Sequence, residues 1–430
     1  MKKTKLGPRF WAALTVFSLV GQIAWVVENM YFNVFIYKMF HASAGAISLM
    51  VAASAIAATL TTLFMGALSD KLGKRKLFIC GGYILWGVSI WSFALIRTDV
   101  IDKLFPAAVS AASVGVSLVI VMDCVMTFFG STANDACFNA WLTDSTDETN
   151  RGAAEGVNAM MPLIAILAVF GGFMGFDLDR PQAWVTIYTV IGAVVILIGV
   201  LGFFLMKEPR VDCSDNKSWL RNLGYGFRPS VMKENAVLYL TLAAFAVFGI
   251  SIQIFMPYLI LYYEVSLGME NYVLIMAPAI LLAAVVTLFY GRLYDRFRFK
   301  ATILPALGLL GGGYLLLYFT RTTVPVFLGS LLMMSGYLAG MAVFGAKLRD
   351  HTPSGKAGMF QGLRIVGQVL IPGVIGPWIG AWVLRNADTI VGSDGTVSFI
   401  PHAGIFLAAL IAGVFVLPAA ALIFRRERGR

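Results

Sequence analysis

Long runs of apolar residues, separated by short polar segments, dominate the pattern of this chain. A helix that crosses the hydrocarbon core of a bilayer needs about 20 predominantly apolar residues. By that criterion the pattern predicts twelve membrane-spanning helices, centred near residues 24, 58, 87, 128, 167, 195, 249, 281, 310, 335, 371 and 413. The fourth apolar run exceeds one span, and we place its helix at 114–141. The runs are continuous rather than alternating, which excludes a β-barrel.

Polar turns between these runs occur in repeated pairs. Residues 66–76 read G-A-L-S-D-K-L-G-K-R-K and residues 291–300 read G-R-L-Y-D-R-F-R-F-K, with Gly, Leu, Asp and a base at the same spacing. A second repeat aligns residues 140–158 with 346–364, with six of nineteen positions identical. Both repeats lie six predicted spans apart, as expected for two parallel six-helix halves. We therefore predict an N-terminal half, a cytoplasmic linker and a C-terminal half, at residues 1–206, 207–235 and 236–430.

The composition agrees with a protein that lies in a bilayer. The 430 residues are 59% hydrophobic and only 13% charged, too little charge to cover a soluble protein of this length. Most of the 33 lysines and arginines fall in segments that place both termini in the cytoplasm. This distribution accounts for the net charge of +10 without a nucleic-acid partner. We predict a multi-pass protein of the inner (plasma) membrane.

Enzyme chemistry finds no support in the sequence. The three histidines are scattered, the four cysteines lack metal-site spacing, and a phosphate-binding Gly-Lys-Ser/Thr loop is missing. We therefore predict neither a cofactor nor a metal site. The expected partners are a small-molecule solute, a proton as the candidate coupling ion, and membrane lipid, for a chain that acts as a monomer.

With these turns and repeats, the chain resembles the major facilitator superfamily, whose signature lies between spans 2 and 3. Within it, the chain is most similar to the glycoside–pentoside–hexuronide:cation symporters and their sucrose-transporter relatives. That similarity rests on W-L-T-D-S-T-D-E-T-N-R at 141–151 and R-D-H-T-P-S-G-K-A-G-M-F-Q-G at 349–362. The resemblance implies an all-α fold of two pseudo-symmetric bundles. It also implies alternating-access transport of a sugar, a glycoside or a similar polar solute.

The resemblance also implies a gate at the signature turn. Asp70 would approach the positive N-terminus of span 11, near residues 353–355, and gain about 0.3–1 kcal/mol. Asp295 would do the same for span 5. The predicted gating residues are Gly66, Asp70, Gly73, Arg75 and Asp295. The alternative is a solvated turn whose charges only set the topology, an interpretation that covers Lys74, Arg75 and Lys76.

Four ionisable residues lie within predicted spans: Glu28, Asp123, Asp135 and Arg364. Each costs about 2.5–3.5 kcal/mol at a helix centre on insertion scales, so each is a candidate functional residue. A polar and aromatic stripe at 100° per residue accompanies Glu28 on span 1, formed by Gln22, Trp25, Asn29, Phe32 and Asn33. Such a stripe offers hydrogen-bond partners and flat apolar faces to a sugar.

From these positions we predict a substrate site, formed by Trp25, Glu28, Asn29, Asp135, Arg364 and Gln368. The alternative is that the polar groups only satisfy neighbouring helices, with Arg364 in a static ion pair with a buried carboxylate such as Asp135. Asp123 is placed nearer the external mouth and is the weaker candidate.

Sodium coupling is not expected. Sodium-coupled relatives carry two aspartates on span 2, where this chain has Ala58 and Thr62, and the family's lysine within span 11 is missing. A proton taken up by Glu28 or Asp135 is the predicted coupling ion, because burial favours a protonated carboxylate. A facilitator or exchanger stays open. Two other readings also stay open: a carrier of amphipathic compounds or lysolipids, and a non-transporting sensor on the same scaffold.

Overall fold

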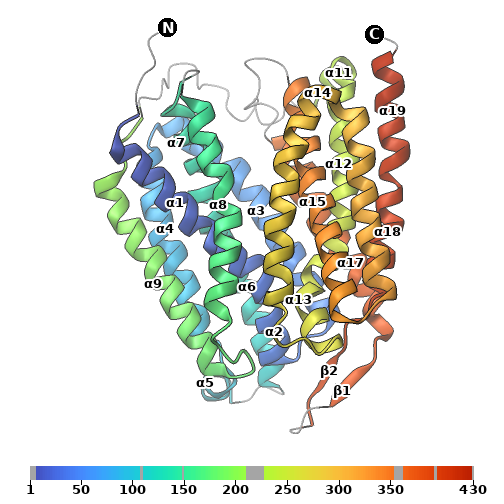
Figure 1. Cartoon of the computed structure of the whole chain (residues 1–430). Helices are drawn as coiled ribbons and strands as arrows, with labels where there is room; N and C mark the ends of the chain where they lie inside the picture. The colour runs from blue at the N-terminus through green and yellow to red at the C-terminus, as the bar shows by residue number, and fades with distance from the viewer. Residues whose placement is uncertain are drawn as a thin grey trace. The chain divides into compact units, whose positions relative to one another are not determined.

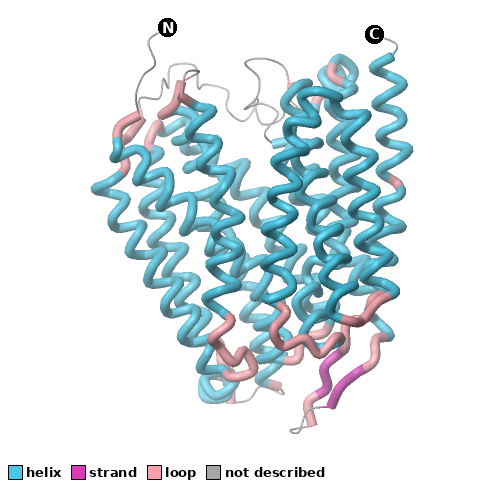
Figure 2. The backbone as a smooth tube through the Cα atoms, viewed as in Figure 1, coloured by secondary structure: helices cyan, strands magenta, loops and turns pink. Residues whose placement is uncertain are grey.

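The computed structural model describes residues 6–106, 110–147, 150–209, 227–352, 362–391 and 395–428. Within these ranges the chain is overwhelmingly helical (Figures 1 and 2). Eleven of the described helical segments are long and apolar enough to span a bilayer. The longest, α14 (Val273–Phe319), has 47 residues and is interrupted at Arg298, where φ is 60° and ψ is −174°. Because α14 is long enough for two spans, these eleven segments can account for the twelve predicted spans. The predicted all-α polytopic fold is confirmed.

The chain packs as two compact units. Unit 1 comprises Met1–Ala42 and Ile56–Leu223, and unit 2 comprises Ser43–Ala55 and Gly224–Arg430. Helix α3 (Ala44–Leu72) is therefore divided, with its first turns in unit 2 and its remainder in unit 1.

The other elements of unit 1 are α1 (Pro8–Val26), η1 (Val27–Tyr31), α2 (Phe32–Phe40), α4 (Arg75–Ser92), η2 (Phe93–Leu95), α5 (Thr98–Leu104), α6 (Ala111–Gly130), η3 (Ser131–Phe138), α7 (Asn139–Asp144), α8 (Arg151–Phe173) and α9 (Pro181–Leu205). Those of unit 2 are α11 (Pro229–Glu234), α12 (Ala236–Phe255), η6 (Met256–Tyr258), α13 (Leu259–Leu261), η7 (Tyr262–Ser266), α14, α15 (Thr323–His351), η8 (Val366–Leu370), α17 (Ile371–Val383), η9 (Leu384–Asn386), β1 (Thr389–Val391), β2 (Val397–Phe399), α18 (Gly404–Val414) and α19 (Val416–Arg428). The two strands form an antiparallel hairpin, with Ile390 opposite Ser398.

Four of these elements are π-helical turns inside membrane-spanning segments: η1, η3, η7 and η8. A π turn holds one residue more than an α turn, and it occurs often at functional sites. Predicted site residues lie in three of them: Glu28 and Asn29 in η1, Asp135 in η3 and Gln368 in η8. The π turns therefore single out the same segments of spans 1, 4 and 11 as the polar sequence pattern.

Glycine allows close approach of helices within each unit, as expected where lipid removes the hydrophobic drive for helix association. One close approach joins α14 to α15. A Cβ atom on Gly313 would lie 2.7 Å from the Cα of Met333 and 2.8 Å from the carbonyl oxygen of Gly329. A Cβ on Gly308, on the same helix, would meet nothing within 4 Å.

These two glycines give a matched test of the packing. Gly313→Ala should lower the apparent melting temperature of the detergent-purified protein, because overpacking a tight contact costs about 1–3 kcal/mol. Gly308→Ala should leave it unchanged or raise it, because alanine favours a helix over glycine by up to about 1 kcal/mol. Equal effects of the two substitutions on thermal unfolding would contradict this packing.

Candidate functional site

Spans 1 and 4 pack against each other in antiparallel register within unit 1. Four contacts pair successive turns of the two helices: Phe17 with Phe138, Gly21 with Asn134, Trp25 with Gly130 and Glu28 with Thr127. From one contact to the next, the residue number on span 1 increases by the same amount as the residue number on span 4 decreases. This register sets the depth of every polar group on the two spans.

Glu28 lies in η1 with only 7% of its surface exposed. Its Oε1 atom accepts a hydrogen bond from the hydroxyl of Thr127 at 2.9 Å. Asp123 lies one helical turn before Thr127 on α6 and is 2% exposed. The sequence ranks Asp123 as the weaker candidate, but it is more deeply buried than Glu28 and close to it in register.

Asp135 lies elsewhere on the fourth span. It is half-buried in η3, and its Oδ2 atom accepts a hydrogen bond from the Ser131 hydroxyl at 3.0 Å. From Thr127 to Asp135 the chain rises about 12 Å at the spacing of an α-helix. The structure therefore brings Glu28 to Thr127 and separates it in depth from Asp135.

Asn134, the neighbour of Asp135, anchors this π turn. Its side-chain amide donates to the Tyr83 hydroxyl at 2.7 Å, and Tyr83 donates in turn to the carbonyl of Phe17 at 2.7 Å. A Cβ on Gly21 would collide with the Asn134 side chain, so glycine is needed where span 1 passes. These buried bonds fix spans 1, 3 and 4 around the segment that carries Asp135.

The polar stripe predicted on span 1 does not continue past η1. Trp25 is half-buried and Asn29 is exposed, whereas Phe32 and Asn33 are each 1% exposed. The prediction assumed 100° per residue throughout, but the extra residue of the π turn rotates the following segment. Phe32 and Asn33 consequently turn into the bundle.

Two tryptophan rings, those of Trp25 and Trp86, are in contact beside the stripe on span 1. The rings of Trp25 and Trp86 lie 5.0 Å apart, and both contact the position of Gly130. Each indole Nε1 is buried without a hydrogen-bond partner among the described residues, as is the Oδ1 atom of Asn33. The sequence pattern missed Trp86, because the two tryptophans of span 3, Trp86 and Trp91, are not at a spacing that places them on one helix face.

In unit 2, Arg364 and Gln368 are half-buried on span 11. The Nε atom of Arg364 is buried without a hydrogen bond, and no ion pair joins Arg364 to any described carboxylate. The internal repeat aligns Arg364 with Asn158 of span 5. Asn158 accepts a 2.5 Å hydrogen bond from Ser18 of span 1. Gln361, which shares the predicted face with Arg364, lies outside the described residues.

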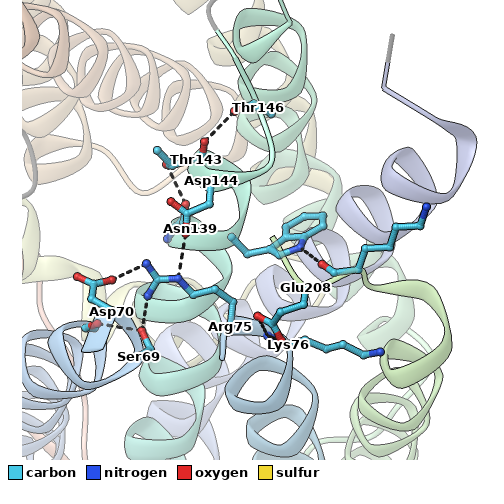
Figure 3. Close-up of polar contacts among 12 residues, drawn as sticks. Ser69, Asp70, Arg75, Lys76, Asn139, Thr143, Asp144, Thr146 and Glu208 are labelled. Atoms are coloured by element: carbon cyan, nitrogen blue, oxygen red, sulfur yellow. Dashed lines mark hydrogen bonds and ion pairs between the residues drawn. The ribbon is translucent and has the colours of Figure 1, made fainter. Parts of the chain in front are cut away.

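The signature turn forms a second polar cluster in unit 1, centred on Arg75 (Figure 3). The Arg75 guanidinium pairs with Asp70, donates to the Asp144 carboxylate at 3.0 Å and donates to the Ser69 hydroxyl at 2.6 Å. Arg75 is 4% exposed, so the alternative of a solvated, topology-setting charge is wrong for this residue. It is wrong because three acceptors compensate the buried guanidinium.

This cluster ties the two repeat motifs of unit 1 together. Asp144 comes from the segment after span 4, and its link to Arg75 was not predicted. The contact of Asp70 with the start of span 11, near residues 353–355, lies outside the described residues. Gly73 has φ of +62° and ends α3, a conformation in which a side chain is strained. Gly66 lies in ordinary contact with Ala136, so its Cβ would fit at 3.7 Å.

The repeated turn in unit 2 is built differently. Tyr294, the counterpart of Ser69, donates to the Asp350 carboxylate at 2.7 Å, and Arg298 lies 4.0 Å from the same group. Asp295 is exposed and borders a cavity of about 310 Å³ that Arg349 also lines. Its gating role stays a prediction.

Charges at the opposite end of unit 1 are paired with carboxylates. Lys38 contacts Asp179 at 3.0 Å, and Arg180 contacts Asp177 at 2.8 Å. A third pair follows span 3, where Arg97 donates two hydrogen bonds to Asp99 and holds the pKa of that carboxyl below its ordinary value.

This fold and site define a helical, multi-pass membrane protein with buried carboxylates inside its spans. The model of the Major Facilitator Superfamily matches residues 13–377, and the chain belongs to that superfamily. It is therefore a transporter rather than an enzyme, and the sequence-based identification of the superfamily is confirmed.

Individual relatives are distant. Sugar efflux transporter B of Salmonella typhimurium is 24% identical over 201 residues, which cover 47% of this chain and 46% of that protein. The chain thus matches about half the length of this relative.

Solved structures share the fold over nearly the whole chain. The nucleoside transporter NupG has a TM-score of 0.69 at 14% identity, and the alignment covers 96% of this chain and 98% of that one. A bacterial homologue of the human lysosomal transporter Spinster, inward-facing and unoccupied, has a TM-score of 0.70 at 16% identity and coverages of 99% and 98%. The E. coli xylose transporter XylE, in a partially occluded inward-open conformation, has a TM-score of 0.68 at 14% identity and coverages of 96% and 98%.

The buried Arg75 cluster generates a stability prediction. Arg75→Gln should lower the apparent melting temperature, because hydrogen bonds to charged groups contribute about 1.5–3 kcal/mol each and three acceptors lose their donor. Lys74→Gln, an exposed change in the same turn, serves as the control and should have little effect. If both variants unfold at the wild-type temperature, the cluster contributes nothing to stability.

Proposed function

We propose that this transporter carries a sugar or glycoside by alternating access and couples that transport to a proton. The observation that carries the proposal is the polar and aromatic group on spans 1, 3 and 4 of unit 1. Trp25 and Trp86 offer indole N–H groups that have no partner among the described residues. Asn29 and Asp135 supply amide and carboxylate groups on the same bundle.

This combination suits a sugar for physical reasons. A pyranose ring has flat apolar faces that stack on aromatic rings, and hydroxyls that need hydrogen-bond partners. An indole presents both a face and one donor. An amphipathic lipid would instead gain most from a continuous apolar lining, and buried unpaired N–H groups would penalise it. The polar atoms therefore favour the sugar over the lysolipid alternative.

The comparisons support the same solute class without naming a substrate. One relative is named a sugar efflux transporter, and one structural neighbour is a xylose transporter. In unit 2, Arg364 and Gln368 are the proposed solute contacts. The buried Nε of Arg364 has no hydrogen-bond acceptor among the described residues, so a solute oxygen could accept its hydrogen bond.

Proton rather than sodium coupling is proposed because span 2 lacks the required carboxylates. Ala58 and Thr62 occupy the positions where sodium-coupled relatives carry aspartates, and neither residue can supply a charged oxygen. We further propose an inner-membrane location with cytoplasmic termini. The paired bases at the Lys38 end of unit 1 agree with an external face that carries little unpaired positive charge.

For gating, we propose that the Asp70–Arg75–Asp144 cluster keeps the signature turn rigid. Asp70 is half-exposed, whereas the guanidinium that it contacts is buried. Arg75 thereby holds the Asp70 carboxylate in place within the turn. In the proposed gate Asp70 acts on a helix N-terminus, with a gain of about 0.3–1 kcal/mol.

The experiment is uptake into proteoliposomes with an imposed pH gradient. The probes are glucose, xylose, sucrose, lactose and lysophosphatidylcholine, each with and without sodium. We expect at least one sugar to accumulate with proton flux and no stimulation by sodium. Trp25→Phe should weaken its half-saturation by up to about tenfold, the value of one hydrogen bond. Trp91→Phe, an exposed tryptophan on α4, is the matched control.

Other outcomes would refute specific parts. Transport of the lysolipid alone would replace the sugar assignment, and steep sodium dependence would overturn the proton proposal. An absence of both exchange and net flux for every probe would favour a sensor. Equal effects of Trp25→Phe and Trp91→Phe would remove Trp25 from the solute site.

A further inference from the structure

A buried carboxylate outside the proposed solute site remains to be explained. Asp123 is 2% exposed in the apolar middle of the fourth span. An ionised carboxylate there costs about 2.5–3.5 kcal/mol on insertion scales. If this carboxylate only filled space, an apolar residue at position 123 would make the folded protein more stable. Its position beside Glu28 suggests what it does.

The register of spans 1 and 4 sets Asp123 and Glu28 around one threonine. Thr127 donates to Glu28 across the helix interface at 2.9 Å, and Asp123 lies one turn away on the face of Thr127. Cys124 follows Asp123 directly on α6. Glu28 and Asp123 therefore lie on either side of Thr127, about one helical turn apart along the bundle, and both are buried in unit 1.

An aromatic cluster follows Glu28 along span 1, toward the end of unit 1 that carries the Lys38–Asp179 ion pair. Tyr188 is fully buried about two turns into α9. Its ring packs in a cluster with four others: Phe32 at 5.6 Å, Phe35 at 5.1 Å, Phe93 at 5.5 Å and Trp184 at 5.8 Å. The Tyr188 hydroxyl has no hydrogen-bond partner among the described residues. Each of these five residues is at most 2% exposed, so the cluster is buried inside unit 1.

We propose that Glu28 and Asp123 share one exchangeable proton and form the coupling site of the transporter, separate from Asp135. This assignment rests on the proposed function, since a coupling proton presupposes coupled transport. Two like charges in a buried site repel, and one proton converts that repulsion into an O–H···O⁻ hydrogen bond. The proton binds a carboxylate oxygen from water on one side and returns to water on the other.

The neighbouring groups have distinct parts in this site. Thr127 orients the Glu28 carboxylate through the hydrogen bond that it donates. Two titratable side chains neighbour the pair: Cys124, next to Asp123 on α6, and Tyr188 of α9, whose ring packs against Phe32 of span 1. Asp135 lies about 12 Å beyond Thr127 along the fourth span, and we assign it to the solute site.

Infrared spectroscopy of the purified protein tests the pair without any solute. Near neutral pH, wild type should show the carbonyl stretch of a protonated carboxylic acid. Glu28→Gln and Asp123→Asn should each remove the same band area, because the new amide donates to the remaining carboxylate and lets it ionise. The double variant should lose no more than either single variant, and Asp135→Asn should retain this band.

The outcomes separate the proposal from its alternatives. A band lost in only one of the single variants assigns the proton to one carboxylate and overturns sharing. Sharing is also overturned if the double variant loses twice the band area of a single variant, or if wild type shows no such band. Variants that unfold are replaced by Thr127→Val, which should shift the midpoint of the band's pH titration; an unshifted midpoint contradicts the site.

Transport assays make the two possible failures distinguishable. In proteoliposomes with xylose and sucrose, Asp123→Asn should keep counterflow and lose accumulation driven by the pH gradient. If wild type moves neither sugar while the shared band is present, the proposed function fails and the pair stands. If wild type accumulates a sugar with protons while the band is missing, the pair fails and the function stands.

Discussion

The antiparallel contact between spans 1 and 4 is the interaction on which the polar interior of unit 1 depends. It sets Glu28 level with Thr127 and Gly21 level with Asn134. A shift of one turn would carry Glu28 away from its donor and drive the Asn134 side chain into the backbone of span 1. Because lipid offers no hydrogen bonds, the helices must satisfy these polar groups themselves, and only one register does so.

The bilayer also explains how the charges are distributed between the two polar clusters. Arg75, at the end of a span, is buried but surrounded by three acceptors, so its charge is compensated. The carboxylates of Glu28 and Asp123 lie deep in the bundle, where protonation is the less costly way to remove a charge. The first cluster is therefore suited to holding a turn in place, and the second is the proposed site of proton exchange.

Much of the fold could be predicted from the sequence, because spans of about 20 apolar residues and two internal repeats are visible in the pattern itself. The superfamily followed from the same turns. The depth of the site could not be predicted, since it depends on helix register. The π turn η1 rotates Phe32 and Asn33 away from the predicted stripe. The burial of Arg75 depends on Asp144, which is distant in sequence.

A double-mutant cycle on thermal and denaturant unfolding tests this register most directly. The account predicts that Glu28→Leu and Thr127→Val are coupled, with an interaction energy of about 0.5–3 kcal/mol, as for residues in contact. Glu28→Leu and Asp135→Asn should be additive to within about 0.5 kcal/mol, as for separated sites. Additivity in the first pair together with coupling in the second would contradict the register and the separation of the two carboxylates.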